Sequence, residues 1–171
     1  MAPNALLRKK REEIVREHMD SENRHEFDAT LETFDHPRYE LIATGDVYDG
    51  AEEVADYFKE SRTAFPDQRN EVLALHHADD AVLVEAVIRG TQKGPLRGLP
   101  PTGREYELPI LAIFMFDGDK LNCERIYFDQ TTVRRQLGIG RDPLSLTGRL
   151  QTLVGHPWTI GRGVVRQLTG R

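Results

Sequence analysis

Asp129 is the residue whose position in the sequence best suits acid–base chemistry. It directly follows a strand-like run that ends ERIYF, and it precedes a short helical pattern that begins at Gln130 and closes in QLG. A carboxylate that emerges from hydrophobic surroundings has a raised pKa, which makes it a candidate general base. Asp is also a common helix cap. The sequence therefore leaves two roles open for Asp129, acid–base catalysis and capping of the following helix.

Arg125 and Tyr127 are candidate partners of Asp129. All three share one strand parity if no bulge intervenes, so their side chains would lie on the same face. Arg125 and Tyr127 could then donate hydrogen bonds to a substrate carbonyl and to the enolate that forms from it. A bulge would reverse the parity. In the alternative arrangement, Arg125 faces outward and pairs with Glu85 or Glu124.

His76 and His77 are adjacent, so a regular strand places one imidazole on each of its faces. At most one of them can face a cavity, and we include His77 among the candidate catalytic residues as a second acid or base. Two adjacent histidines on a strand cannot bind one metal, and the sequence has no HxxxH, HxH or Cys/His cluster, so we predict no metal site. Cys123 has no His at motif spacing and is expected to be a packed thiol.

These candidates need a sheet to hold them, and the hydrophobic pattern predicts one. Helical spacing predicts a helix over 4–19, a second helix capped by Asp20 or Ser21, and a third that begins at Asp49 and stops at Pro66. Short strands over 38–44 and 46–48 lie between the second and third helices. Strand patterns follow over 71–77 and 81–91, and an Asp-Gly turn then joins the last two strands as a hairpin. Helices ahead of a consecutive antiparallel meander favour an α+β fold. Residues 108–116 are apolar on both faces, which predicts a curved sheet around a pocket.

Composition narrows the class of protein. The net charge of −5 argues against general nucleic-acid binding, and no apolar run approaches the roughly 20 residues of a membrane span. A single cysteine excludes an internal disulfide, and the N-terminal residues lack the apolar core of a secretory signal. We therefore expect a soluble, cytoplasmic protein.

The last part of the chain differs in kind from the rest. We divide the sequence into a domain over 1–138 and a tail over 139–171. Residues 138–171 hold five arginines and one aspartate, whereas the preceding residues are strongly acidic. Trp158 and the valines near it hint at a basic amphipathic segment, although Gly161 and Gly163 weaken any helix. We predict that the tail packs on the acidic domain or on a neighbouring subunit.

Several short motifs, in order, resemble one family. They are FPD at 65–67, GTQKG at 90–94, GLPPTG at 98–103, DGDKL at 117–121, and Asp129 followed by QLG at 136–138. In this order and spacing they resemble the SnoaL-like polyketide (ester) cyclases of the nuclear-transport-factor-two-like superfamily, over roughly residues 8–138. The resemblance implies a cone of helices on a curved sheet. The chain departs from the family at Gln92, where many relatives have His, and at Ile126, near which relatives commonly have Trp.

The same resemblance implies a reaction. In the cyclases, the aspartate between the last strand and the QLG helix is the general acid/base, and Asp129 matches it. It would abstract an acidic C–H proton before intramolecular carbon–carbon bond formation, without metal or organic cofactor. We therefore predict a cofactor-free enzyme, a homodimer, that acts on an apolar carbonyl compound. The alternatives are a noncatalytic ligand-binding or assembly module on the same fold, and an isomerase- or epoxide-hydrolase-like enzyme.

Overall fold

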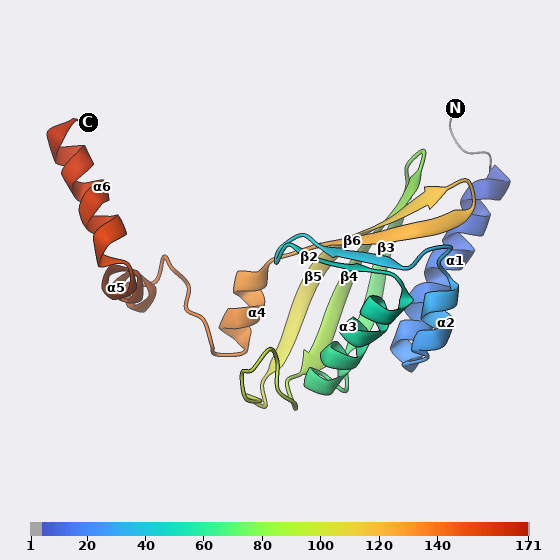
Figure 1. The fold of residues 1–171 in the computed structure, drawn as a ribbon, viewed down its shortest axis with the longest axis horizontal. Helices are drawn as coiled ribbons and strands as arrows, with labels where there is room; N and C mark the ends of the chain where they lie inside the picture. Colours follow the sequence, from blue (N-terminus) through green and yellow to red (C-terminus); the bar gives the residue numbers. More distant parts are fainter. Residues whose placement is uncertain (1–4, 171) are drawn as a thin grey trace.

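The computed structural model describes residues 5–170 and has an α+β fold (Figure 1). Its helices are α1 (Ala5–Arg24), α2 (Phe27–Glu32), α3 (Ala51–Ala64), α4 (Gln130–Gln136), α5 (Leu146–Gly155) and α6 (Pro157–Thr169). Its strands are β1 (Arg38–Leu41), β2 (Asp46–Asp49), β3 (Arg69–His77), β4 (Ala81–Thr91), β5 (Glu105–Asp117) and β6 (Lys120–Phe128). Helices α1–α3 cover one face of a single curved sheet with the strand order β2-β1-β6-β5-β4-β3.

The predicted cone-shaped curved sheet is confirmed, but one pair of its strands is parallel. Strands β3 to β6 form the expected antiparallel meander, but β1 pairs with β6 in parallel, so the sheet is mixed and stays unclosed. This pairing joins residues more than 80 positions apart, beyond the reach of any local pattern. It places Glu40 of β1 directly beside Arg125 of β6.

The hairpin of β5 and β6 contributes a long row of buried side chains to the inner face of the sheet. Gly118 has φ of 60°, as the predicted Asp-Gly turn requires. Along β5, burial alternates with the period of two that a strand imposes. The residues on the inner face are fully covered, namely Leu108, Ile110, Ala112, Phe114 and Phe116. Those on the outer face, Leu111, Ile113 and Met115, are only partly buried.

Helix α1 is longer than the sequence pattern predicted. It continues through Asp20 and Ser21, which do not begin a second helix, and ends at Arg24. The reason is the burial of its last turns, where the Ser21 hydroxyl donates to the carbonyl oxygen of His18 (2.9 Å) and contacts Thr30 Oγ1 (2.8 Å). The side chain predicted to cap a helix therefore joins α1 to α2.

The Gly-rich loop after β4 is held closed by Gln92, which is completely buried. Its backbone N–H donates to the carbonyl oxygen of Arg104 (2.9 Å), and its side-chain oxygen accepts from Thr102 Oγ1 (2.9 Å). Gln92 is absent from the lining of the pocket described below, so it acts on the shape of the loop at the pocket's rim.

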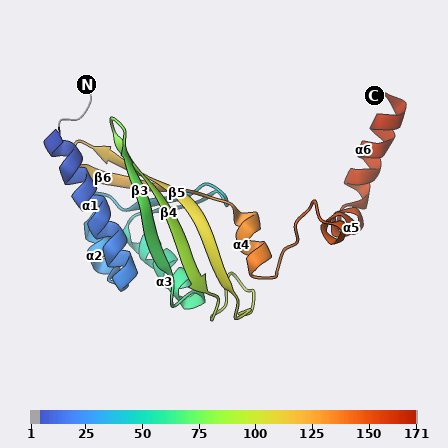
Figure 2. The same ribbon diagram turned by 180° about the vertical axis from the view of Figure 1, so that it is seen from behind.

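The tail differs from its prediction in two respects. It forms two helices, α5 and α6, despite Gly161 and Gly163. These helices pack chiefly on each other and project away from the sheet (Figure 2), and within the described residues the tail meets its own domain only beside α4. Packing on a neighbouring subunit stays a prediction. Within residues 5–170, no helix is both long and apolar enough to cross a lipid bilayer.

Candidate functional site

A mainly apolar pocket of about 200 Å³ lies between α3, the inner face of the sheet, the loop after β4, and α4. The strands present alternate side chains to it, because the period of two sends every second residue inward. Its apolar lining comprises Leu41, Phe65, Ile88, Leu96, Leu108, Ile110, Ile126, Phe128 and Val133. An apolar cavity with a few polar groups is the usual form of a small-molecule site.

Three polar residues of the pocket wall, Ser61, Gln68 and Tyr106, are joined by hydrogen bonds. Gln68 is almost fully buried, and its side-chain oxygen accepts from the hydroxyl of Tyr106 (3.0 Å) and from that of Ser61 (3.3 Å). Burial raises the pKa of Tyr106 and of Tyr57, which also lines the pocket. Both phenols therefore remain neutral over the physiological range and keep a proton that a hydroxyl can donate.

The structure places Asp129 in an exposed position at the end of β6, where it caps α4. Its Oδ1 accepts from the backbone N–H of Thr131 (2.8 Å), and its Oδ2 accepts from the Thr132 hydroxyl (2.6 Å). These hydrogen bonds stabilise the carboxylate and lower the pKa of Asp129. The expectation of a desolvated carboxylate with a raised pKa is wrong, since the apolar neighbours point into the pocket while Asp129 faces solvent.

Arg125, Tyr127 and His77 are absent from the pocket lining, and an outward-facing Arg125 is one of the two arrangements that the sequence left open. For Arg125 and Tyr127, strand parity is the reason, because Ile126 and Phe128 point inward and their neighbours point outward. Arg125 Nε donates to Glu40 Oε2 (2.6 Å), in place of the predicted Glu85 or Glu124.

Tyr127 and His76 lie on the outer face, whereas His77 lies on the inner face in register with Val82 and Phe114, beside α1 and outside the pocket lining. Tyr127 is 40% exposed. His77 lies 3.5 Å from Glu12, and His76 Nε2 contacts Glu85 Oε1 at 2.8 Å. Cys123 is buried as predicted, and burial raises the pKa of its thiol to about 11.

A second group of polar residues is completely enclosed between α1, β1 and β6. Its centre is His18, whose Nδ1 contacts Thr33 Oγ1 (2.9 Å) and whose Nε2 contacts the Tyr39 hydroxyl (2.7 Å). The Tyr39 hydroxyl in turn donates to Glu22 (2.9 Å), and Glu124 Oε2 lies 3.1 Å from His18 Nε2. We call His18, Glu22, Tyr39 and Glu124 the buried cluster.

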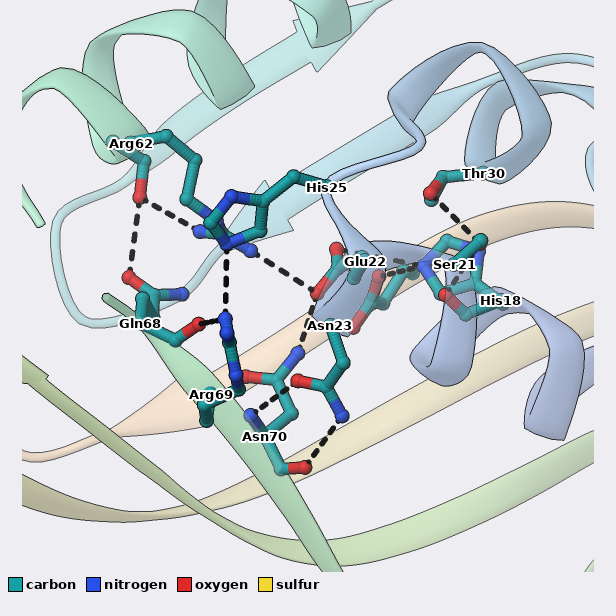
Figure 3. A network of polar contacts seen from close by, with 12 residues as sticks. His18, Ser21, Glu22, Asn23, His25, Thr30, Arg62, Gln68, Arg69 and Asn70 are labelled. Carbon is teal, nitrogen blue, oxygen red and sulfur yellow. Dashed lines mark hydrogen bonds and ion pairs between the residues drawn. The ribbon is translucent and has the colours of Figure 1, made fainter. Parts of the chain in front are cut away.

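Polar groups from α3 and β3 complete the surroundings of Glu22 (Figure 3). The side-chain amide of Asn70 donates to Glu22 Oε2 (2.5 Å), and Arg62 lies 3.8 Å from the same oxygen. Arg62 also donates to the Ser61 hydroxyl (3.3 Å), and Ser61 lines the pocket. A continuous polar path therefore joins the pocket wall to the buried cluster.

The charges of the buried cluster are set by burial and mutual attraction. Burial disfavours the imidazolium, but the carboxylates of Glu124 and Glu22 outweigh it and raise the pKa of His18 to about 9. Burial raises the pKa of Glu124. Burial also acts to raise the pKa of Glu22, but the positive charges of His18 and Arg62 have the larger effect, so the pKa of Glu22 is lowered. A charged histidine between two acids, with Arg62 beside them, keeps this interior nearly neutral.

His18, Glu22 and Glu124 are also the group of described residues whose ligand atoms are close enough for a metal, all within 4.8 Å. The Tyr39 hydroxyl already bridges His18 and Glu22 there. Glu124 Oε2 is buried there without a hydrogen-bond partner among the described residues and is compensated by its ion pair with His18 (3.1 Å). The predicted lack of a metal site stays a prediction.

The sequence analysis did not predict the buried cluster, although the spacing of His18 and Glu22 along α1 indicates that both are buried. Val15, His18, Met19 and Glu22 follow the i, i+3, i+4, i+7 spacing of one helix face, and all four are buried. A glutamate on the apolar face of a helix needs a partner inside the protein. Glu124 shares strand parity with Ile126 and Phe128, which also placed it on the inner face.

The fold and the pocket define a class, a helix-covered cone of curved sheet with an apolar pocket between the helices and the sheet. The model of the SnoaL-like polyketide cyclase family matches residues 12–137. The chain therefore belongs to the SnoaL-like polyketide cyclase family, as its motifs indicated. No curated protein matches the sequence.

Solved structures support the fold. A candidate SnoaL-like polyketide cyclase from Jannaschia sp. CCS1 superposes with a TM-score of 0.72 at 20% identity, over 82% of this chain and 100% of that one. A phenazine biosynthesis-related protein from Pseudomonas aeruginosa gives 0.71 at 23% identity, over 86% and 93%. A protein with a ketosteroid isomerase-like fold from Catenulispora acidiphila gives 0.64 at 20% identity, over 74% and 93%.

Proposed function

We propose that this protein is a cofactor-free enzyme that binds a small apolar carbonyl compound in its pocket and uses Asp129 as acid and base at the pocket's edge. The observation that carries the proposal is the position of Asp129 between Phe128 and Gln130, both of which line the pocket. Membership of the cyclase family supports the class of reaction. The apolar lining supports an apolar ligand.

The lowered pKa of Asp129 restricts the substrate. The carboxylate is ionised at neutral pH and can accept a proton, but it is a weaker base than a desolvated carboxylate. The C–H bond must therefore be acidic, as it is between two carbonyl groups. Asp129 takes this proton, the resulting enolate carbon attacks a second carbonyl carbon of the same molecule, and the new alkoxide takes the proton back.

The enolate oxygen requires donors that stay protonated. Tyr57, a neutral phenol in the pocket wall, takes this role in place of Arg125 and Tyr127. Tyr106 is a second donor once its hydroxyl releases Gln68.

The test uses an aromatic β-keto ester in deuterated water, with exchange of its acidic C–H followed by NMR. The variant Asp129→Asn should slow enzyme-dependent exchange by about 10²–10⁴ while the same compound still raises the melting temperature. Thr132→Ala is the matched control, since it removes a hydrogen bond to the cap and keeps the carboxylate. Equal exchange rates in Asp129→Asn and wild type would show that Asp129 is only a helix cap.

A noncatalytic binding module is the second candidate. The engagement of both Asp129 oxygens as a cap favours it, because a base must release at least one of these hydrogen bonds. In that case ligands would raise the melting temperature of wild type and Asp129→Asn equally, and neither protein would exchange the C–H proton faster than buffer.

We also propose a homodimer formed through the outer face of the sheet. Leu111, Ile113 and Met115 are only partly buried there, and Tyr127 is exposed beside them. An apolar sheet face of this kind is a usual site for a second layer. Ile113→Glu should give a monomer by light scattering, and an unchanged mass would contradict this interface.

A further inference from the structure

The two tail helices present apolar faces that no other part of residues 5–170 covers. On α5 these are Leu146, Leu150, Leu153 and Val154, and on α6 they are Trp158, Val164, Val165 and Leu168. Trp158 is 84% exposed and Leu168 is 82% exposed. Figure 1 shows both helices at the end of the molecule opposite α1, clear of the sheet.

The spacing of these residues produces one stripe on each helix. On α5 they follow i, i+4, i+7 and i+8 from Leu146, and on α6 Trp158, Val165 and Leu168 follow i, i+7 and i+10. The helix ends are specified locally as well. Ser145 accepts from the backbone N–H of Gly148 (3.0 Å), and Gly170 ends α6 with φ of 64°.

The charge of this segment has one sign. Residues 143–170 contain Arg149, Arg162 and Arg166 and no aspartate or glutamate. Arg162 and Arg166 lie four residues apart, which places them together on the side of α6 next to its apolar stripe. Trp158 adjoins the same boundary, where an indole ring can contact both an apolar layer and polar headgroups.

Short helices of this kind are marginal in water, so their stability depends on whatever covers the stripe. An interface with another protein ordinarily surrounds its apolar core with a polar, solvent-accessible rim. A uniformly cationic border with an apolar stripe and a boundary tryptophan is instead the pattern of a helix that lies in the surface of a membrane.

We propose that α5 and α6 bind the surface of an anionic lipid bilayer, with their apolar stripes in the acyl layer and Arg162 and Arg166 among the headgroups. The helices lie in the plane of the surface, consistent with the lack of a spanning helix among the described residues. The link from Gly138 to Ser145 lets the cone stay in water beside the bilayer. This inference does not depend on the proposed reaction.

The experiment is flotation of the full chain with vesicles of phosphatidylcholine alone or with added phosphatidylglycerol. We expect strong binding only to the anionic vesicles, and weaker binding as salt is raised. Arg162→Gln together with Arg166→Gln should weaken it roughly 30-fold, since each cation near an anionic surface contributes roughly a fivefold factor. Trp158→Ser together with Leu168→Ser should abolish it.

The matched control removes the same charge from the other end of the molecule, by Arg8→Gln together with Lys9→Gln on α1. This variant should bind as wild type does. Absence of binding to anionic vesicles, or equal binding to neutral ones, would overturn the proposal. So would tail variants that change the oligomeric mass of the protein without changing its binding to vesicles, which would assign the apolar stripes to a second copy of the chain.

Discussion

Raising the pH above neutrality should destabilise this protein through His18. The imidazole is completely buried, and its partners from every packed element are known: Glu22 on its own helix, Thr33 after α2, Tyr39 on β1 and Glu124 on β6. In the unfolded chain the histidine titrates near 6.5, and in the folded protein its pKa is about 9. Between these two pKa values, the imidazole is protonated in the folded state and neutral in the unfolded state.

The sign and the size of the effect follow from this difference. Because the folded pKa is the higher one, the stabilisation is fully present below pH 6.5 and is lost as the pH rises through about 9. At about 1.4 kcal/mol for each pKa unit, the loss is about 3 kcal/mol. The raised pKa of Glu124 acts in the same direction, since folding also favours its protonated form.

The assay is urea unfolding at about pH 6 and about pH 9.5. Wild type should lose about 3 kcal/mol between them, whereas His18→Gln should be less stable at pH 6 but nearly independent of pH. Glu124→Gln should show a smaller loss than wild type. His76→Gln is the control, since it removes an exposed histidine paired with Glu85. An unchanged wild-type stability, or an equal loss in His18→Gln, would refute the reasoning.

Two further predictions concern packing. Gly94→Ala should lower stability by about 1–3 kcal/mol in thermal or urea unfolding, because a Cβ there would lie 2.0 Å from the carbonyl oxygen of Thr63. Gly155→Ala, whose Cβ meets nothing within 4 Å, is the control, and equal stability of the two variants would contradict the close approach. Cys123 should react slowly with a thiol reagent at mildly alkaline pH and quickly in urea, because it is buried and its pKa is about 11. Rapid labelling of the folded protein would show that this strand opens.

The sequence by itself determined the local structure of the sheet and its turns. Apolar residues over 108–116, an Asp-Gly turn and a second apolar run specify the hairpin of β5 and β6, because pleating and turn geometry are short-range properties. Asp129 at a strand-to-helix junction was predicted in the same way, and so was its possible role as a cap. The ordered motifs were sufficient for the family.

Only the tertiary structure decided which face of each strand is inside. Strand parity places Arg125 and Tyr127 on one face of β6 and Ile126 and Phe128 on the other. Which of these faces is buried depends on the helices that pack over it. The parallel pairing of β1 with β6 gave Arg125 its partner Glu40.

The buried cluster depends on the tertiary structure still more strongly. His18, Tyr39 and Glu124 come from three distant segments, and their pKa values exist only where burial and neighbouring charges act together. Local patterns specify periods and turns because these depend on adjacent residues. The protonation of a buried group depends on side chains that only folding brings within a few ångströms of one another.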